Sequence, residues 1–204
     1  MVWHRDKLIV GLTGMPGSGK DAALSRVKDF FQVYRMGDIV IEEAKRRNLE
    51  ITTENIGNIA TELRNKEGPG AIASRLVDKI YMDKIEGDII FINGIRSMYE
   101  VEIFKKHLKN FFLINIHASP ETRFKRVLKR KREDDAVDRK IFDEKDKREL
   151  SWGLGDVIAL ADRVIENEAT EEELMRRFRD LLLEISSGNT RKTVKKLFSD
   201  YDDK

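Results

Sequence analysis

The stretch GLTGMPGSGKDA, residues 11–22, decides the fold prediction. Gly14 is followed by four residues and then by Gly19 and Lys20, which is the spacing of a phosphate-binding loop. In such a loop a strand turns sharply into a helix, and backbone N–H groups converge on phosphate oxygens that only glycines allow so close. The helix that begins near Gly19 adds the positive end of its dipole. This stretch therefore predicts a nucleotide site in which Lys20 reaches the β- and γ-phosphates.

The segments beside the loop have the patterns that this site requires. KLIVGLT (7–13) is typical of a buried parallel strand, and the helical stretch from Lys20 places Leu24, Val27 and Phe31 on one face. The alternative is a glycine-rich turn with an incidental lysine, which the flanking strand and helix disfavour. The predicted nucleotide-binding residues are Gly14, Met15, Pro16, Gly17, Ser18, Gly19, Lys20 and Asp21.

The residue after Lys20 departs from the motif. A Ser or Thr hydroxyl normally stands there and ligates magnesium, whereas this chain has Asp21. An acidic residue is expected at the end of the neighbouring strand, in DIIFINGIRS (88–97), whereas this chain has Asn93. Because both positions face the metal, we expect the two side chains to lie side by side, with Asn93 donating to Asp21. The predicted cofactors are ATP and Mg²⁺, with Asp21 and Asn93 as the metal site; drift in a weakened site is the alternative.

Apolar runs alternate with helical patterns along the rest of the chain. Further strands are predicted at 32–36, 88–94, 110–118 and 161–167, and helices occupy most of 38–85. A helix should begin at Pro120 behind the N-cap Ser119, and another after a capping box of Thr170 and Glu173. Strands that alternate with helices predict a parallel sheet covered on both faces. The expected fold class is α/β, a three-layer sandwich with a mostly parallel five-stranded sheet.

Composition narrows the class of protein. The 204 residues fit one domain, and 39 Lys and Arg against 37 Asp and Glu give a net charge of +2. This balance argues against a dedicated nucleic-acid or membrane-surface protein, whose basic excess is usually large. The absence of cysteine excludes disulfides and thiolate metal sites. No apolar run reaches the length of a signal or transmembrane segment, so we expect a soluble, cytoplasmic protein.

Several motifs together resemble an archaeal family of P-loop proteins related to adenylate kinase. They are GMPGSGK (14–20), MGDIVIEEA (36–44), LRNKEGPGAIASR (63–75), NGIRSMYEVEIFK (93–105) and DKRELSWGLGDVIALADRVIEN (146–167). The resemblance covers roughly residues 7–186 and is specific in combination more than motif by motif. A more distant likeness to dephospho-coenzyme A kinase lies in the loop and in ADRVIEN.

The resemblance implies a P-loop NTPase fold of the nucleotide-kinase type. A single domain, 1–188, would contain acceptor-binding helices at about 38–85 and a lid at about 123–150. Gly37 and Asp38 match the GD that opens the acceptor-binding helices of adenylate kinases. Arg96 matches an arginine that contacts the acceptor's phosphate, and Arg64 lies in the region where those kinases place another, so the implied acceptor-binding residues are Asp38, Arg64 and Arg96. Related family members carry Ser at position 21 and Asp at position 93, the reverse of this chain.

A basic helix is predicted at the start of the implied lid. Arg123, Arg126 and Arg130 share one side of it, opposite a buried stripe of Phe124, Val127 and Leu128. Arginines facing a cleft can stabilise a transferring phosphoryl group without proton transfer. The predicted catalytic residues are therefore Lys20, Arg96, Arg126 and Arg130, with Arg139 and Arg148 as further lid candidates. The alternatives are a solvated face paired with the acidic stretch that follows, or a nucleic-acid surface, which that acid disfavours.

The predicted activity is transfer of the γ-phosphoryl group of ATP to a nucleotide or a nucleotide-containing small molecule. A regulatory ATP- or AMP-binding protein and a slow ATPase acting on RNA or protein are the alternatives. Asn167 lies where related folds place the loop around the adenine ring, and Trp152 is expected to pack at the base of the lid. The charged tail, 189–204, is either frayed or a short amphipathic helix that docks or contacts a partner.

Overall fold

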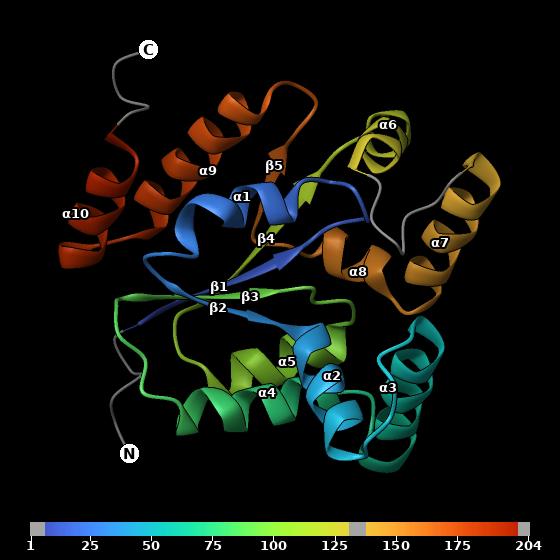
Figure 1. Cartoon of the computed structure of the whole chain (residues 1–204). Helices are drawn as coiled ribbons and strands as arrows, with labels where there is room; N and C mark the ends of the chain where they lie inside the picture. The colour runs from blue at the N-terminus through green and yellow to red at the C-terminus, as the bar shows by residue number, and fades with distance from the viewer. Residues whose placement is uncertain (1–6, 131–137, 200–204) are drawn as a thin grey trace.

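The computed structural model describes residues 7–130 and 138–199. A five-stranded sheet forms its centre, in the order β2-β3-β1-β4-β5 (Figure 1). Every pairing between neighbouring strands is parallel. The prediction of a mostly parallel sheet is confirmed, and the sheet is in fact parallel throughout. The strands are β1 (Leu8–Thr13), β2 (Gln32–Arg35), β3 (Ile89–Asn93), β4 (Phe111–His117) and β5 (Arg163–Glu166), all within the predicted segments.

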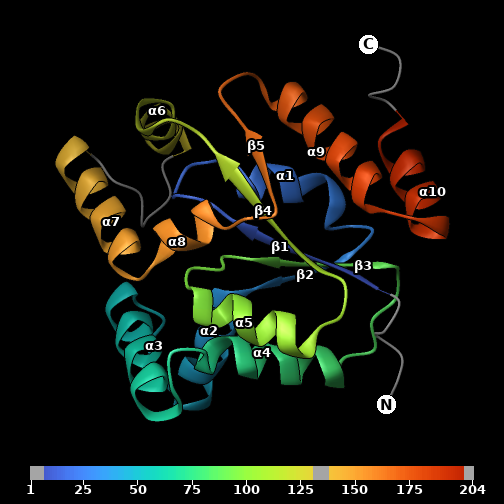
Figure 2. The same cartoon turned by 180° about the vertical axis from the view of Figure 1, so that it is seen from behind.

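Helices cover both faces of the sheet, as the predicted three-layer α/β class requires (Figures 1 and 2). One face carries α2 (Met36–Arg46), α3 (Thr53–Glu67), α4 (Ala71–Met82) and α5 (Met98–His107). The other carries α1 (Lys20–Val27), α9 (Glu171–Ile185) and α10 (Gly188–Leu197). The helices α6 (Pro120–Arg130), α7 (Arg139–Ser151) and α8 (Leu154–Ala159) lie at the end of the sheet where β1 meets α1.

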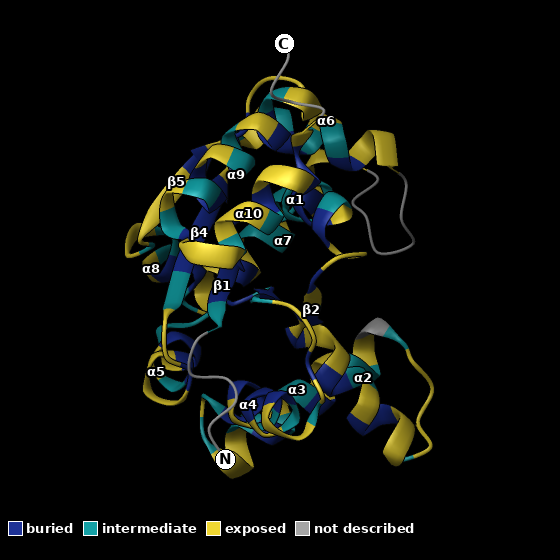
Figure 3. Ribbon diagram, turned by 90° about the vertical axis from the view of Figure 1, so that its left-hand side faces the viewer, coloured by how far each residue is buried: buried dark blue, intermediate teal, exposed yellow. Residues whose placement is uncertain are grey.

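The core has two main parts, one on each side of the sheet. One buried apolar cluster joins the sheet to α2, α3, α4 and α5, and a second joins it to α1, α9 and α10. Figure 3 shows this burial along the strands and on the inner faces of the helices. The central strands β1 and β3 are buried almost throughout, because a parallel sheet is covered on both faces. The carboxyl ends of these strands are therefore held rigidly against the loops that follow them.

Local capping follows the sequence at one predicted helix start and departs from it at another. Ser119 accepts the N–H of Thr122 at 3.3 Å, which confirms the predicted cap before Pro120. Thr170 accepts the N–H of Glu173 at 3.3 Å, but the Glu173 carboxylate binds Arg176 and Arg177. The capping box predicted at α9 is therefore only half formed. A complete capping box lies at the start of α5, between Ser97 and Glu100.

The end of the described chain is a docked helix. Val194, Leu197 and Phe198 are buried against α1 and α9, and Arg26 donates to the backbone oxygen of Leu197 at 3.4 Å. Of the two alternatives for the tail, the structure shows the docked helix for residues 188–197. The expected boundary at 188/189 falls in the first turn of α10, whose apolar side chains belong to the core. Tyr201 lies outside the described residues.

Candidate functional site

The loop between β1 and α1 has the geometry that its glycines predict. Gly14, Gly17 and Gly19 all have positive φ, at 136°, 80° and 109°. A Cβ added to Gly14 would lie 2.3 Å from the backbone oxygen of Ile116, and one on Gly19 would lie 2.2 Å from Asn167 Nδ2. Ile116 at the end of β4 and Asn167 after β5 thus contact the loop so closely that no side chain fits at Gly14 or Gly19. Glycine is required here by the fold as well as by the approach of a ligand.

Lys20 begins α1 and folds its side chain back over the loop. Its Nζ donates to the backbone oxygens of Gly14 at 2.5 Å and Met15 at 3.1 Å. Burial and, to a smaller extent, the positive charge of Arg96 lower the pKa of Lys20 to about 8. The carboxylates of Glu149 and Asp21 oppose that shift. Arg96, which follows β3, and Glu149 of α7 therefore lie close enough to Lys20 to affect its ionisation.

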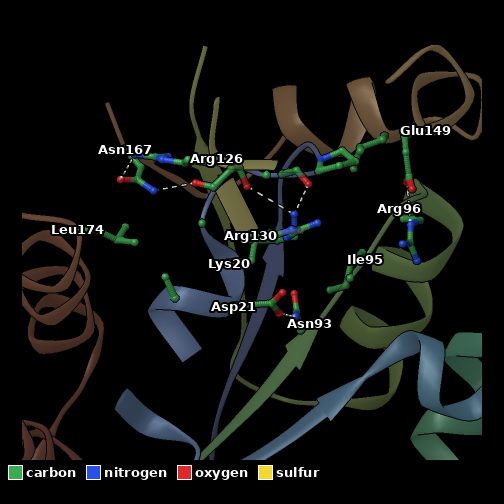
Figure 4. A pocket seen from close by; sticks show the side chains of 18 of the residues that line it. Lys20, Asp21, Asn93, Ile95, Arg96, Arg126, Arg130, Glu149, Asn167 and Leu174 are labelled. Carbon is green, nitrogen blue, oxygen red and sulfur yellow. Dashed lines mark hydrogen bonds and ion pairs between the residues drawn. The ribbon is translucent and has the colours of Figure 1, made fainter. Parts of the chain in front are cut away.

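A cavity of about 560 Å³ lies at the loop (Figure 4). It is large enough for a nucleotide-sized ligand. Its lining includes seven of the eight predicted loop residues, Met15 being the exception, together with Asn93, Arg96, Arg126 and Arg130. Asp38 and Arg64 do not line this cavity. Residues that the sequence analysis did not assign also line it: Ala22, Gly94, Ile95, Lys145, Glu149, Leu154, Ala169, Glu171 and Leu174.

Asp21 and Asn93 lie side by side on one wall of the cavity, as expected (Figure 4). Asn93 Nδ2 donates to Asp21 Oδ1 at 3.2 Å. Asn93 is only 8% exposed, and its Oδ1 is buried without a hydrogen-bond partner in the described structure. The pair therefore offers one carboxylate and one amide oxygen, which are hard ligands that suit Mg²⁺.

A metal cage made only of protein groups is not present in residues 7–130 and 138–199. No cluster of three or more His, Cys, Asp or Glu side chains that could hold an ion is found there. Mg²⁺ is usually bound by one or two carboxylates, waters and substrate phosphates and does not need such a cage. The residues at the loop fit this mode of binding.

Arg96 follows β3 and pairs with a carboxylate that the sequence analysis did not assign. Its Nε donates to Glu149 Oε2 at 2.8 Å, and Glu149, on α7, is 5% exposed. The backbone N–H of Arg96 donates to Glu100 Oε2 at 2.8 Å, and Arg64 Nη2 lies 3.7 Å from Glu100 Oε1. Burial raises the pKa of Glu100, and the Arg96 N–H and the charge of Arg64 oppose this. Arg64 thus supports the turn that carries Arg96 and does not reach the cavity itself.

The arginines of α6 do not act as one row. Arg123 is 3% exposed and binds both oxygens of Asp146, at 2.8 and 2.5 Å, and the backbone oxygen of Pro16 at 3.1 Å. Its guanidinium therefore joins α6, α7 and the loop, and the prediction that Arg123 faces the cleft with Arg126 and Arg130 is wrong. Of the arginines of α6, only Arg126 and Arg130 line the cavity. The basic sequence continues with Lys131 and Arg132, which lie outside the described residues.

The other lid predictions are also changed by the packing of α7. Arg139 pairs with Asp143 at 2.9 Å and Glu121 at 3.2 Å, away from the cavity. Arg148 lies over the ring of Trp152, 5.9 Å from its centroid, and does not line the cavity. The buried stripe of α6 keeps Val127 and half-buried Phe124, which packs on Phe142 of α7, but Leu128 is exposed. Helical periodicity identified the face correctly but not its extent.

Comparison with known proteins places this geometry in a family. A family model described as "AAA domain" (AAA_17) matches residues 13–141, the part of the chain that holds the loop, β3 and α6. "UPF0200 protein MJ1399" of Methanocaldococcus jannaschii is 45% identical over 179 residues, which are 87% of this chain and 90% of that protein. "UPF0200 protein PF1294" of Pyrococcus furiosus is 40% identical over 184 residues, 89% and 99% of the two chains. The chain belongs to the UPF0200 family.

Solved structures support the fold of this UPF0200 chain. TT1252 from Thermus thermophilus superposes with a TM-score of 0.61 at 18% identity, over 89% of this chain and 99% of the other. Shikimate kinase from Acinetobacter baumannii, in complex with shikimate, superposes with a TM-score of 0.55 at 12% identity, over 89% and 94%. At these identities the likeness shows a P-loop kinase-like fold and nothing of the substrate. The predicted archaeal P-loop family and fold class are confirmed.

Asn167 of this UPF0200 chain connects several parts of the site. Its Nδ2 donates to the backbone oxygen of Ser18 at 2.8 Å, and its Oδ1 accepts from Arg126 Nη2 at 3.2 Å. It lines the cavity near Leu174, on the side opposite Arg96 and Glu149 (Figure 4). The position expected for a nucleotide base therefore lies beside the loop.

Glu149 is the main residue of the UPF0200 site that sequence reasoning missed. It lies in DKRELSWGLG, part of a motif quoted for the resemblance, but no role was assigned to it among the many charged residues around it. The sequence did hold one signal for the burial of Glu149. Phe142 lies seven residues earlier, so the two side chains share one face of the helix, and Phe142 is also buried. A lone acidic residue on such a face is a candidate for a buried, functional group.

No helix within the described residues is long and apolar enough to cross a membrane.

Proposed function

We propose that this protein is an ATP-dependent phosphotransferase that moves the γ-phosphoryl group to a nucleotide or a nucleotide-containing small molecule. One observation carries the proposal: a single cavity is lined by the loop with Lys20, the Asp21–Asn93 pair and the cations Arg96, Arg126 and Arg130. The AAA-domain match and the kinases among the structural neighbours support it.

The donor would lie along the loop. Backbone N–H groups at the start of α1 and the ammonium of Lys20 would bind the β- and γ-phosphates. Asp21 and Asn93 would hold Mg²⁺, which neutralises charge on those phosphates when it is bound. Asn167 and Leu174 would flank the nucleoside, because they lie at the end of the cavity nearest the loop's helix.

The charge of the cavity suits a polyphosphate. Its lining holds five cationic and three carboxylate side chains, so the lining carries an excess of positive charge when Lys20 is protonated. Arg126 and Arg130 extend from α6 to the cavity and would stabilise the charge of the transferring group without reorganisation. Arg96 lies at the opposite end from Asn167 and is assigned to the acceptor side.

Calorimetry with ATP in the presence of Mg²⁺, followed by transfer assays with γ-labelled ATP, tests the proposal. We expect the wild-type protein to bind ATP and the Lys20→Ala variant to lose most of that affinity while keeping its fold. Label should then appear on a small-molecule acceptor. ATP binding with neither transfer nor hydrolysis would favour the regulatory alternative, and absence of ATP binding would reject the site.

A further inference from the structure

The ion pair of Arg96 and Glu149 lies at the end of the cavity assigned to the acceptor. This end lies across the cavity from Asn167 and Leu174, with Lys20 and the Asp21–Asn93 pair between the two ends (Figure 4). Glu149 lines the same cavity as Lys20, whose ammonium is assigned to the γ-phosphate, and Glu149 is 5% exposed. Glu149 is thus a buried carboxylate on the wall of the cavity in which the transfer would take place.

The charges at this end do not suit a phosphate acceptor. Arg96 is already neutralised by Glu149 at 2.8 Å, Arg64 is directed to Glu100, and Asp38 does not line the cavity. A phosphate placed against Arg96 would also meet the carboxylate of Glu149, and like charges at close range repel strongly where water is excluded. A hydroxyl group fits the same pair without this cost, because it can donate to Glu149 while its oxygen accepts from Arg96.

We propose that Glu149 is a catalytic base and that the acceptor is an alcohol, so that the γ-phosphoryl group is transferred to a hydroxyl oxygen and not to a phosphate. This inference rests on the proposed phosphotransferase function and specifies its substrate class. A phosphate oxygen is already deprotonated at neutral pH and needs no base, whereas an alcohol must lose its proton during attack. Glu149 is placed to take that proton, whereas transfer to a phosphate would give this carboxylate no role.

The step balances with the groups present. The acceptor oxygen forms a bond to the γ-phosphorus as the bond from that phosphorus to the β–γ bridging oxygen breaks. The electron pair of the broken bond leaves with ADP, and the acceptor's proton passes to a Glu149 carboxylate oxygen. Arg96 holds the carboxylate in place through the hydrogen bond from its Nε. The products are ADP, a phosphate monoester and protonated Glu149, which returns its proton to solvent.

The test compares the wild-type protein with Glu149→Gln, Arg96→Ala and the control Glu144→Gln. Glu144 lies on the same helix, is exposed and does not line the cavity. γ-Labelled ATP is offered with two phosphate acceptors, AMP and CMP, and two hydroxyl acceptors, dephospho-coenzyme A and adenosine. Hydrolysis of ATP is measured in parallel, because water is itself an O–H acceptor. Affinity for ATP is measured by calorimetry with Mg²⁺.

We expect label on a hydroxyl acceptor. Glu149→Gln should lower turnover by about 10²- to 10⁴-fold, the usual contribution of a general base, with ATP affinity within about twofold of wild type. Hydrolysis should fall in the same variant, and Glu144→Gln should match the wild type in every assay. Arg96→Ala breaks the same ion pair but leaves the base, so it should mainly raise the acceptor's KM.

Other outcomes overturn the inference. Conversion of AMP to ADP or of CMP to CDP would reject the alcohol, and hydrolysis or transfer unchanged in Glu149→Gln would reject the base. If Glu149→Gln and Arg96→Ala lower kcat equally, and the double variant is no worse than either, Glu149 acts only by holding Arg96. A wild-type protein that does not bind ATP, or that binds it with neither transfer nor hydrolysis, instead rejects the phosphotransferase itself, and the inference falls with it.

Discussion

Exchanging the residue types at positions 21 and 93 tests whether the two side chains act as one unit. In this chain the carboxylate lies on the loop side and the amide on the strand side, and Asn93 Nδ2 donates to Asp21 Oδ1 at 3.2 Å. The double change Asp21→Ser with Asn93→Asp keeps one carboxylate and one neutral polar group. We expect it to bind ATP with Mg²⁺ about as well as the wild type, whereas each single change should bind ATP less well.

The magnitudes follow from this contact. A hydrogen bond to a charged group contributes about 1.5–3 kcal/mol, so Asp21→Ser, which removes the carboxylate, should weaken ATP binding by roughly 10- to 150-fold. Asn93→Asp would place two carboxylates about 3.2 Å apart, where repulsion reaches about 5 kcal/mol at an effective dielectric constant of about 20. Rotation or protonation of one carboxylate reduces this figure. Because the double variant should match the wild type, the coupling equals the sum of the two single costs, and the cycle should show at least about 2–3 kcal/mol.

The assay is calorimetry of ATP binding for all four proteins, over a magnesium titration and with a chelator. The wild type should lose affinity steeply as Mg²⁺ is removed, because Asp21 then repels the β-phosphate without a cation between them. Thermal unfolding of each variant controls for loss of structure. Additive effects of the two single changes, or ATP binding that is equal with the chelator, would refute the reasoning and favour drift in a weakened site.

Three further predictions concern the loop, α6 and α2. Lys20→Ala should lower ATP affinity or abolish turnover without lowering the Tm, since the change removes a half-buried charge; calorimetry with unchanged affinity would contradict this. Arg123→Ala strands Asp146 beside the loop and should lower the free energy of unfolding in denaturant by about 3–5 kcal/mol, against about 0–1 kcal/mol for the exposed control Arg139→Ala. Hydrogen bonds, first from Arg46, lower the pKa of Glu43 to about 2 from 4.5, so its stabilisation is complete above pH 4.5 and is lost as the pH falls toward 2. Glu43→Gln should lower the free energy of unfolding by about 1–3 kcal/mol at neutral pH, a range kept low because solvent screens the charge of Arg46, which is 71% exposed. Between pH 4.5 and 2, the free energy of unfolding of this variant should fall less steeply with decreasing pH than that of the wild type.

Much of the fold could be predicted because its signals are local. The strand before Gly14 and the helix after Lys20 lie within one short stretch, and β1, β3 and β4 are short apolar runs. The Asp21–Asn93 contact was also predictable, since carboxyl ends of adjacent parallel strands meet at one edge of the sheet. These inferences need only neighbours in sequence or in strand order.

The fate of the C-terminal segment could not be predicted from its own pattern. Val194, Leu197 and Phe198 have helical spacing, but spacing alone fits both a frayed tail and a docked helix. The decision depends on the apolar surface that α1 and α9 leave beside them, which is a property of tertiary packing. The Arg123 error has the same origin, because periodicity assigns a helix face but does not say that Asp146 of α7 will lie against it.

Three buried polar side chains explain why the site as a whole is harder to read from sequence than the sheet. Asn167 joins the end of β5 to the loop and to α6, Arg123 joins α6 to α7 and the loop, and Glu149 joins α7 to the turn after β3. Each bonds across separate elements, so no local pattern marks it. A buried polar group costs free energy unless its partners are in place, and these three therefore hold α6 and α7 against the loop and the turn after β3 in one arrangement. The shape of the cavity depends on contacts between segments that are far apart in the sequence. The resemblance could therefore identify Arg96 from its motif, whereas Glu149 beside it is identified only in the folded chain.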